Sequence, residues 1–323
     1  MRMKYLSIKH LTLLCIAALS TSVFTSCDMM TEDRDDCPMG LYLNFKYDYN
    51  LERADMFNDH VGAVDVYVFD ENGKYVTMQS EANVGTSMPL AVPTYTMKMN
   101  LDPGKYKFIV LAGQDSYAEQ MESGRARFVR SDLTAGDDMT ALDIKLETTP
   151  QGNNMLLVDN HGLPLDTLWH GMEVEPVEVF AEKPTYHTIS LMRDTKKINV
   201  TLREIDDPTK MDVANYDMTI TDRNSHILWD NSLDETNTVI YTPHATWNTD
   251  DRTPAFDANG NEMEELGQIG HADFMTSRIL YHDNAADDGR LTITNKVTGQ
   301  EGATLNLPDI LSRLRTSEGI YRY

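Results

Sequence analysis

The chain has 323 residues, 41% of them apolar, and its 28 lysines and arginines against 51 aspartates and glutamates give a formal net charge of −23. So acidic a chain is not expected to bind nucleic acid, because phosphate recognition depends on clustered cations. The length favours two domains of ordinary size over a single large core.

The amino terminus has the features of a secretory signal peptide over residues 1–26. Arg2, Lys4 and Lys9 form a basic region, an apolar run follows at residues 11–19, and small residues come after it. The apolar run is shorter than the roughly 20 helical residues that span a bilayer. The segment is therefore expected to direct export and then be removed.

Cys27 is the predicted lipidation site. Phe24, Thr25, Ser26 and Cys27 resemble a bacterial lipobox, although Phe24 replaces the usual aliphatic residue. Cleavage before Cys27 would leave it as the first residue, carrying a diacylglycerol and an amide-linked acyl chain. Each buried methylene contributes about 0.8 kcal/mol, and stable anchoring needs more than one chain. The alternative is ordinary cleavage, with Cys27 paired to Cys37; the three cysteines exclude a richer disulfide framework.

Residues 27–39 are predicted to form an acidic tether. Removing residues 1–26 deletes three cations and no anions, so the mature chain carries 25 − 51 = −26. Five of the residues that follow Cys27 are acidic: Asp28, Glu32, Asp33, Asp35 and Asp36. The segment resembles the surface-export signal of Bacteroidota lipoproteins, which would place the protein on the outer face of the outer membrane. A plain disordered spacer fits the same residues.

The next segment, residues 40–182, is predicted to be an N-terminal β-sandwich. Residues 41–47 and 64–69 alternate apolar and polar side chains with the period of a strand. Asn72 and Gly73 offer a pair of positive-φ residues for a tight hairpin after the second of these strands. A second hairpin is expected to join residues 95–101 to residues 105–112 through Asp102-Pro103-Gly104. Further strands are expected at residues 141–146 and 174–180, with a long loop at 148–166.

The pattern begins again in residues 183–323, the predicted C-terminal β-sandwich. Expected strands cover residues 187–191, 196–202, 216–221, 227–229, 239–241, 278–281, 291–294 and 303–307. Only residues 308–315 have the pattern of a helix, with a proline at the start and arginines near the end. Short strands without interleaved helices favour an all-β fold of two sandwiches in series over a βαβ architecture.

The search for catalytic and cofactor motifs finds none, so the chain is expected to be neither an enzyme nor a cofactor-binding protein. Phosphate-binding glycine loops, the nucleophile elbow and the HExxH pair are all absent. His170, Glu173 and Glu175 could meet a metal ion, but a solvated strand edge is the favoured interpretation, and no metal site is predicted.

Two weaker signals concern sugars. The acid pairs Asp250-Asp251 and Asp287-Asp288 suggest a glycosidase, although an acidic chain produces such pairs by chance. The tryptophans Trp169, Trp229 and Trp247 are equally compatible with stacking on sugar rings and with packing in a core.

Together these segments resemble the minor-fimbrium anchoring subunit family of Bacteroidota. The resemblance rests on the acid-tethered lipobox and on segments at residues 65–73, 101–106, 168–171 and 291–296, in an order that spans nearly the whole mature chain. It implies two tandem transthyretin-like β-sandwich domains, a lipidated Cys27 and no catalysis. It also implies that the protein anchors or caps type V fimbriae at the outer membrane, or serves as an accessory or tip subunit.

The expected partners are therefore fimbrial stalk subunits or other fimbrial subunits, joined by addition of a β-strand to an open sheet edge. Family members usually continue beyond the last helix, whereas this sequence ends at Tyr323. The second sandwich is accordingly expected to lack its last strands, leaving an edge for a partner or an exposed edge. The alternative function is a surface glycan-binding or adhesive lipoprotein that is not part of a fimbria.

Overall fold

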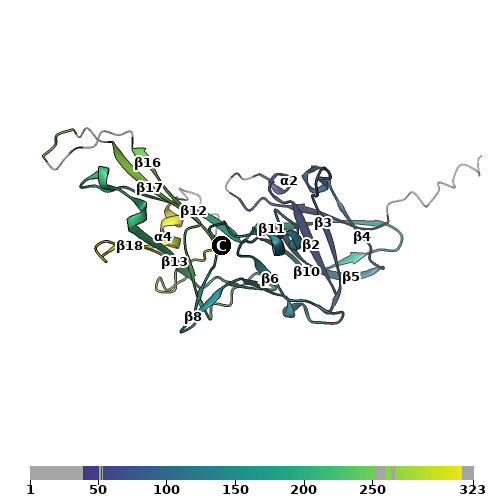
Figure 1. Ribbon diagram of the computed structural model, residues 1–323. Helices are drawn as coiled ribbons and strands as arrows, with labels where there is room; N and C mark the ends of the chain where they lie inside the picture. Colours follow the sequence, from purple (N-terminus) through teal and green to yellow (C-terminus); the bar gives the residue numbers. More distant parts are fainter. Residues whose placement is uncertain are drawn as a thin grey trace, which may run out of the picture.

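The protein is almost entirely built of β-strands (Figure 1). The computed structural model describes residues 39–314, except residues 51, 53, 252–255, 257, 258 and 263–265. The predicted signal peptide, Cys27 and nearly all of the predicted tether lie outside the described residues. The expected all-β class is confirmed.

Eleven strands lie between residues 40 and 193: β1 (Gly40–Lys46), β2 (Ala63–Asp70), β3 (Tyr75–Ala82), β4 (Met97–Met99), β5 (Gly104–Gly113), β6 (Phe128–Arg130), β7 (Asp143–Leu146), β8 (Thr149–Gly152), β9 (Met155–Leu157), β10 (Trp169–Val179) and β11 (Pro184–Arg193). Eight follow: β12 (Thr195–Leu202), β13 (Tyr216–Asp222), β14 (His226–Leu228), β15 (Thr238–Tyr241), β16 (Ala245–Asp251), β17 (Gly267–Ser277), β18 (Arg290–Asn295) and β19 (Glu301–Asn306). The helices are short: α2 (Phe57–His60), α3 (Tyr117–Glu122) and α4 (Leu307–Leu314).

Seven strands form a nearly closed barrel in the order β3-β2-β5-β10-β11-β1-β4. Every pairing in it is antiparallel except that of β1 with β11. The two end strands approach each other, because the Gln79 side-chain amide on β3 donates to the carbonyl of Lys98 on β4 at 2.9 Å. This contact joins the two end strands at one point, and the backbone of Tyr75 at the start of β3 is bonded to Gly136 and Asp137.

The hairpin predicted after residue 69 is confirmed, since β2 pairs with β3. Its turn differs from the expectation, because Gly73 has a φ of +78° whereas Asn72 is not among the positive-φ residues. The carboxylate of Asp70 instead accepts the backbone N–H groups of Asn72 and Lys74, at 2.8 and 2.9 Å. One glycine and one side-chain acceptor thus replace the expected positive-φ pair.

The second predicted hairpin, between residues 95–101 and 105–112, is wrong. Strand β4 pairs with β1, while β5 pairs with β2 on one side and β10 on the other. Both edges of β5 are therefore occupied, and no hydrogen-bonding edge is left for β4. The Asp102-Pro103-Gly104 turn leads the chain from one side of the barrel to the other.

The long loop predicted at residues 148–166 contains the hairpin β8–β9. Its residues Gly152, Asn153 and Asn154 all have positive φ, between +51° and +85°. The Gly- and Asn-rich composition that suggested a loop therefore builds a tight turn. Strand β9 then pairs in parallel with β15, 80 residues further along the chain.

The C-terminal part places two sheets face to face. A six-stranded sheet has the order β19-β18-β13-β15-β9-β8, and a three-stranded sheet has the order β12-β17-β16. Side chains from both sheets, including Ile220, Leu291 and Phe274, share one hydrophobic cluster. The strand predicted at residues 278–281 is wrong, because β17 covers the eleven residues before it. The predicted terminal helix is confirmed as α4, shifted by one residue.

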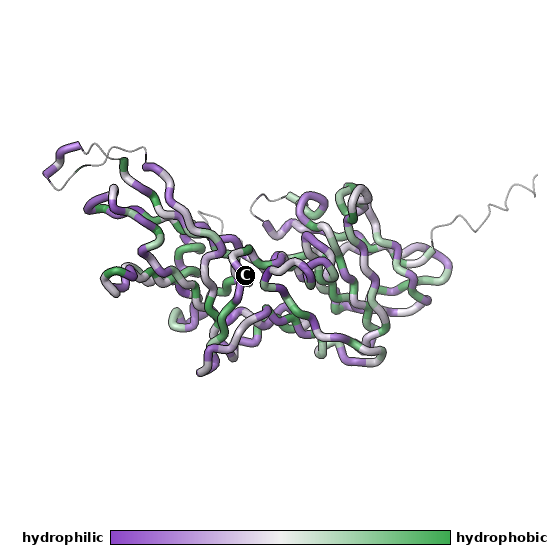
Figure 2. Tube along the Cα trace, in the orientation of Figure 1, coloured by the Kyte–Doolittle hydropathy of each residue, from purple (hydrophilic) through white to green (hydrophobic). Residues whose placement is uncertain are grey.

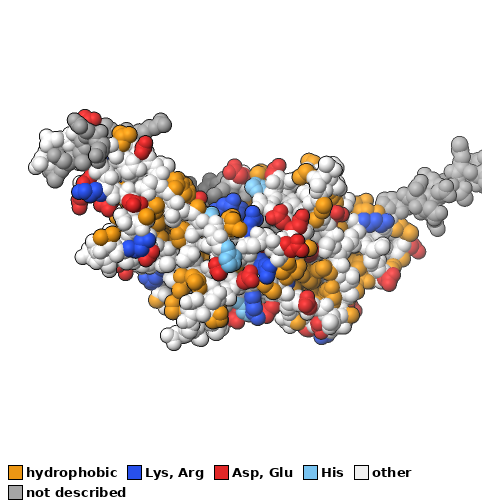
Figure 3. Space-filling model, in the orientation of Figure 1, with side chains coloured by type: hydrophobic (Ala, Val, Ile, Leu, Met, Phe, Trp, Pro, Cys, Tyr) orange, Lys and Arg blue, Asp and Glu red, His pale blue; other side chains and the backbone are white. Residues whose placement is uncertain are grey.

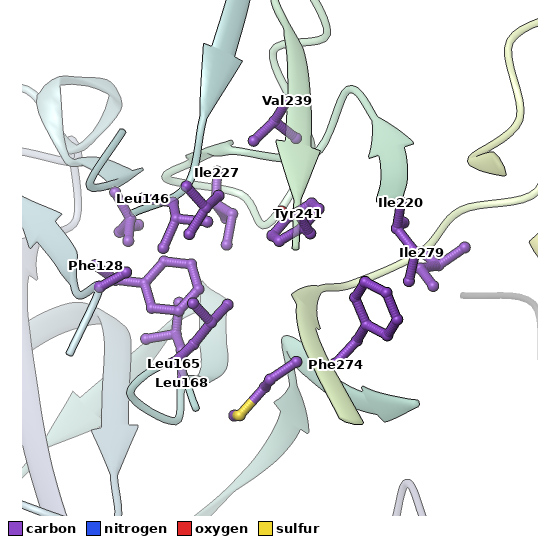
Figure 4. Packing of buried hydrophobic residues seen from close by; sticks show 14 of the residues in the cluster. Phe128, Leu146, Leu165, Leu168, Ile220, Ile227, Val239, Tyr241, Phe274 and Ile279 are labelled. Carbon is purple, nitrogen blue, oxygen red and sulfur yellow. The ribbon is translucent and has the colours of Figure 1, made fainter. Parts of the chain in front are cut away.

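Two hydrophobic cores result. One fills the barrel and includes Leu41, Leu43 and Trp169. The other runs from the outer side of β2 and β5, through the sheet β14-β7-β6, and into the C-terminal sheets. In Figure 4, Phe128, Leu146 and Ile227 of the small sheet lie beside Tyr241 and Phe274 of the C-terminal part, among other side chains of this core.

Strands cross the predicted domain boundary in both directions. The boundary at residues 182 and 183 falls between β10 and β11, which pair in the same barrel. Strands β8 and β9 join the C-terminal sheet, and β14 pairs with β7. The domain limits stay a prediction, and the described part of the chain is joined across them by a shared core.

Two buried ion pairs lie where sheets meet. Arg130 on β6 contacts Asp65 on β2, and its guanidinium also lies 4.4 Å from the ring centre of Tyr117. Asp194, between β11 and β12, lies 3.5 Å from Arg278, which follows β17. Each pair links the barrel to a different neighbouring sheet.

Candidate functional site

The residues considered for metal binding do not form a site. His170 is buried and donates from Nε2 to the carbonyl of Trp229 at 3.1 Å, and burial lowers the pKa of His170 to about 4. Glu173 pairs with His187 at 2.9 Å, and Glu175 is exposed. Within the part of the chain that the structure describes, no group of three or more His, Cys, Asp and Glu side chains could hold a metal ion.

The acid pairs are occupied by structural partners. Asp251 lies 2.8 Å from Arg203, and Asp250 accepts a hydrogen bond from Gln268 at 2.8 Å. Asp287 contacts Arg223. Asp288 is buried and accepts from the backbone N–H of His282 and from the side-chain amide of Asn306. These carboxylates fix loops and strand ends, so they give no support to a glycosidase.

The tryptophans lie in three different environments. Trp169 is fully buried in the barrel core, and Trp229 packs against the second core. Trp247 on β16 is 39% exposed and stacks on His271 of β17, with ring centres 5.1 Å apart. Trp247 alone of the three offers a large part of its ring to solvent.

A second exposed aromatic stack was not predicted from the sequence. Tyr42 on β1 and Tyr186 on β11 stack with ring centres 5.2 Å apart, on the outside of the barrel. The two residues are 144 positions apart, so only the parallel register of β1 and β11 brings them together. The alternation of residues 41–47 placed Tyr42 on one face, but nothing in the sequence indicated its neighbour.

Two cavities adjoin this part of the barrel. One has a volume of about 230 Å³ and is lined by Asn44, Lys46 and Asp55, among others. The other has a volume of about 430 Å³ and is lined in part by His170 and Ser190. Thr188 lines both.

Open sheet edges lie in the C-terminal part. Strands β12 and β16 are the outer strands of their sheet, with 8 and 7 residues, and β19 is an outer strand with 6. Their unpaired backbone groups are the kind of template to which another strand can add. The 8-residue end strand β3 of the barrel is contacted in part, by Lys98 and by Gly136 and Asp137. The C-terminal sheets offer outer edges of 6 to 8 residues in the described part of the chain.

The surface is acidic and mixed. Figure 3 shows red carboxylates spread over the visible face, with basic side chains only in small groups. The tube in Figure 2 has no long hydrophobic segment. Among the described residues, no helix has the length and apolar character needed to cross a bilayer.

Comparisons with known proteins identify one family and several similar solved structures. A family model described as fimbrillin-A associated anchor proteins Mfa1 and Mfa2 matches residues 34–322. A candidate adhesin from Bacteroides thetaiotaomicron is 27% identical, with a TM-score of 0.67 over 87% of this chain and 84% of that one. A protein from the same organism described as a candidate polysaccharide-binding protein is 28% identical, with a TM-score of 0.64 over 85% and 82%.

The fold is also shared with the fimbrial anchor protein Mfa2 from Porphyromonas gingivalis. The two chains are 17% identical, with a TM-score of 0.58 over 87% of this chain and 86% of that one. No curated protein matches the chain significantly.

Proposed function

Because the chain belongs to the family of fimbrillin-A associated anchor proteins, we propose that it is an outer-membrane-anchored fimbrial subunit, acting as an anchor or as an accessory or tip component. The match over residues 34–322 carries this proposal, since it covers nearly everything after the predicted signal peptide. The family is one of fimbrial anchors and adhesins that are not known as enzymes. The two transthyretin-like domains that the resemblance implies belong to the same proposal, with β8, β9 and β14 crossing between them.

Lipid on Cys27 is the proposed attachment to the membrane. This attachment is supported by the lipobox-like residues 24–27 and by the acidic segment that separates Cys27 from β1. Several acyl chains on one residue bind a bilayer far more stably than one chain does. The proposed location is the outer face of the outer membrane, with the β-sheets directed away from the cell.

A cysteine-to-serine change at position 27 tests this attachment. In the Cys27→Ser variant, most of the protein is expected to leave the washed envelope fraction and appear in soluble fractions. The matched variant Cys37→Ser is expected to stay in the envelope, because that thiol takes no part in the attachment. Immunoblots of the two fractions and the mass of the amino-terminal peptide provide the measurement. Retention of Cys27→Ser, or equal release of both variants, contradicts the proposal.

Addition of a β-strand is the proposed way of joining other fimbrial subunits. The edges of β12, β16 and β19 support it, since backbone hydrogen bonds along an open edge supply affinity without a deep pocket. The fimbrillin-A subunits in the family description are the expected class of partner.

Site-specific photo-crosslinking distinguishes these edges. A photoreactive residue at Thr201 on β12 or Thr304 on β19 is expected to give an adduct with a fimbrial subunit in intact cells. The same residue at Thr77, an exposed position on β3 in the barrel and away from the C-terminal sheets, is expected to give none. Adducts of equal yield at Thr77, or none at either C-terminal position, contradict the edge assignment.

Glycan adhesion is the second candidate function. The observation in its favour is the likeness, at 28% identity, to the candidate polysaccharide-binding protein of Bacteroides thetaiotaomicron. It is compatible with anchoring, because an accessory subunit at a cell surface can carry an adhesive face.

A further inference from the structure

A row of three side chains crosses the outside of the barrel. Tyr42 lies between Lys98 of β4 and Tyr186 of β11, its registered neighbours on either side. The Lys98 ammonium lies 5.9 Å from the ring centre of Tyr42, and the two tyrosine rings are inclined by only 24°. Tyr186 is 59% exposed. Tyr42 is therefore enclosed between Lys98 and Tyr186, and the ring face of Tyr186 that points away from Tyr42 is open to solvent.

Polar side chains continue this face along the same strands. Successive residues of a strand point to opposite faces, and residues two apart lie about 7 Å from each other on one face. Leu41 and Leu43 point into the barrel core, so Tyr42 and Asn44 share the outer face. Thr188, the registered neighbour of Asn44, follows Tyr186 in the same way. The aromatic row is thus followed by an amide and a hydroxyl.

This second row opens into the smaller cavity. Asn44, Lys46 and Thr188 line it together with Asp55 and Asn58, within a volume of about 230 Å³. Asn58 on α2 forms part of the cavity wall. Its side-chain amide nitrogen donates to the carbonyls of Leu90 and Val92, at 2.6 and 3.0 Å, and so fixes this wall in place. A concave polar site consequently adjoins an exposed aromatic platform on a rigid sheet.

We propose that this face, defined by Tyr42, Tyr186, Asn44 and Thr188, binds a neutral glycan. The negative face of an aromatic ring attracts the weakly positive C–H groups on one side of a pyranose ring, as it attracts the edges of other rings. The amide of Asn44 supplies donors and an acceptor, and the hydroxyl of Thr188 supplies both. One sugar stacks on Tyr186, and the hydroxyls of the next sugar reach the cavity.

Lys98 contributes one ammonium beside Tyr42, but the carboxylates around the cavity and the charge of the whole chain favour a neutral glycan over an acidic one. The ammonium of Lys46 is paired with Asp48 at 2.5 Å, and Asp55 adds a further carboxylate to the cavity. The whole chain has a net charge of −23, which repels polyanions. The other exposed stack, Trp247 on His271, lines neither of the two cavities and is the weaker platform.

The test is the affinity of the full mature chain, in detergent, for defined sugars. The probes are hexamers of β-1,4-glucose, β-1,3-glucose, α-1,6-mannose and N-acetylglucosamine, with polygalacturonate as the polyanion, measured by isothermal titration calorimetry. Wild type is expected to bind at least one neutral hexamer and not polygalacturonate. Tyr186→Ala is expected to weaken that binding roughly tenfold, with an unchanged melting temperature, because the stacking surface is lost.

Matched variants make the result specific to this face. Tyr186→Phe keeps the ring and is expected to keep the affinity, and Thr188→Val keeps the shape and is expected to lose several-fold. Trp247→Ala removes the other exposed stack and is expected to change nothing. Absence of binding to every neutral hexamer, binding to polygalacturonate alone, or a loss with Trp247→Ala but not with Tyr186→Ala overturns the proposal. None of these results bears on lipid attachment at Cys27, from which the glycan site is independent.

Discussion

The Arg130→Met variant is expected to lose about 3–5 kcal/mol of unfolding free energy, because it leaves the carboxylate of Asp65 buried without its partner. Both side chains are almost inaccessible, with 3% and 11% exposed. The hydroxyl of Ser80, which donates to Asp65 at 2.5 Å, cannot compensate a full charge. The arginine also loses its contact with the ring of Tyr117. Denaturation in urea, followed by circular dichroism, measures the loss.

Two comparisons separate the buried charge from other effects. Lys74→Met breaks an exposed pair with Asp138, where about half of each side chain is accessible, and is expected to cost at most about 0.5 kcal/mol. The double variant Asp65→Leu with Arg130→Met removes both charges and is expected to recover most of the loss, since apolar replacements of a buried pair are often neutral. The exposed Ser80 then turns to water. A double variant as unstable as Arg130→Met would show that packing, and not the orphaned charge, determines the loss.

The elements that the sequence predicts well are those defined by neighbours along the chain. Alternation placed β1 and β2, a glycine marked the turn between β2 and β3, and Pro308 marked the start of α4. The family resemblance is confirmed by the match over residues 34–322. Each of these signals is contained in a few consecutive residues or in their order.

Pairing between distant strands could not be predicted in the same way. Strand β4 has apolar residues that suit a hairpin with β5 as well as a pairing with β1, and only the occupied edges of β5 decide between them. The stack of Tyr42 on Tyr186 likewise depends on a register between strands whose paired residues are 144 positions apart. Strands β16 and β17, which pair with each other, were both missed. Strand β16 is polar and largely exposed, so it has no hydrophobic period.

Buried carboxyls are a further feature hidden in an acidic sequence. Among 51 acidic residues, Asp166, Asp194 and Asp222 lie in the interior, and burial raises the pKa of each to about 6. Composition alone does not distinguish these buried aspartates from the exposed ones. Burial therefore shifts all three toward the protonated form relative to a carboxyl in water.

The protein is therefore expected to be more stable at pH 5 than at pH 7. Each of the three carboxyls binds a proton more readily in the folded chain than in the unfolded one, so its contribution is present below pH 4 and is lost as the pH rises through about 6. His170, with its pKa lowered to about 4, acts in the opposite direction between about 6.5 and 4. His244, whose pKa is also lowered by burial, acts with His170, and His282, whose pKa is raised despite burial because Glu235 and Asp288 contact it, acts with the carboxyls. The three carboxyls against His170 then leave a net uptake of up to two protons, which corresponds to a gain of up to about 3 kcal/mol per pH unit between pH 6 and pH 5.

Replacing one carboxyl identifies its share of this dependence. In Asp194→Asn, the gain between pH 7 and pH 5 is expected to fall by about one proton equivalent, roughly 1.4 kcal/mol per pH unit, because the amide does not titrate. Asp217→Asn, at a position with 67% of its side chain exposed, is the surface control and is expected to leave the gain as it is. Urea denaturation at pH 5, 6 and 7 compares the three proteins. If Asp194→Asn keeps the full gain, Asp194 does not change its protonation on folding in this range, and the ion pair with Arg278 keeps it charged throughout.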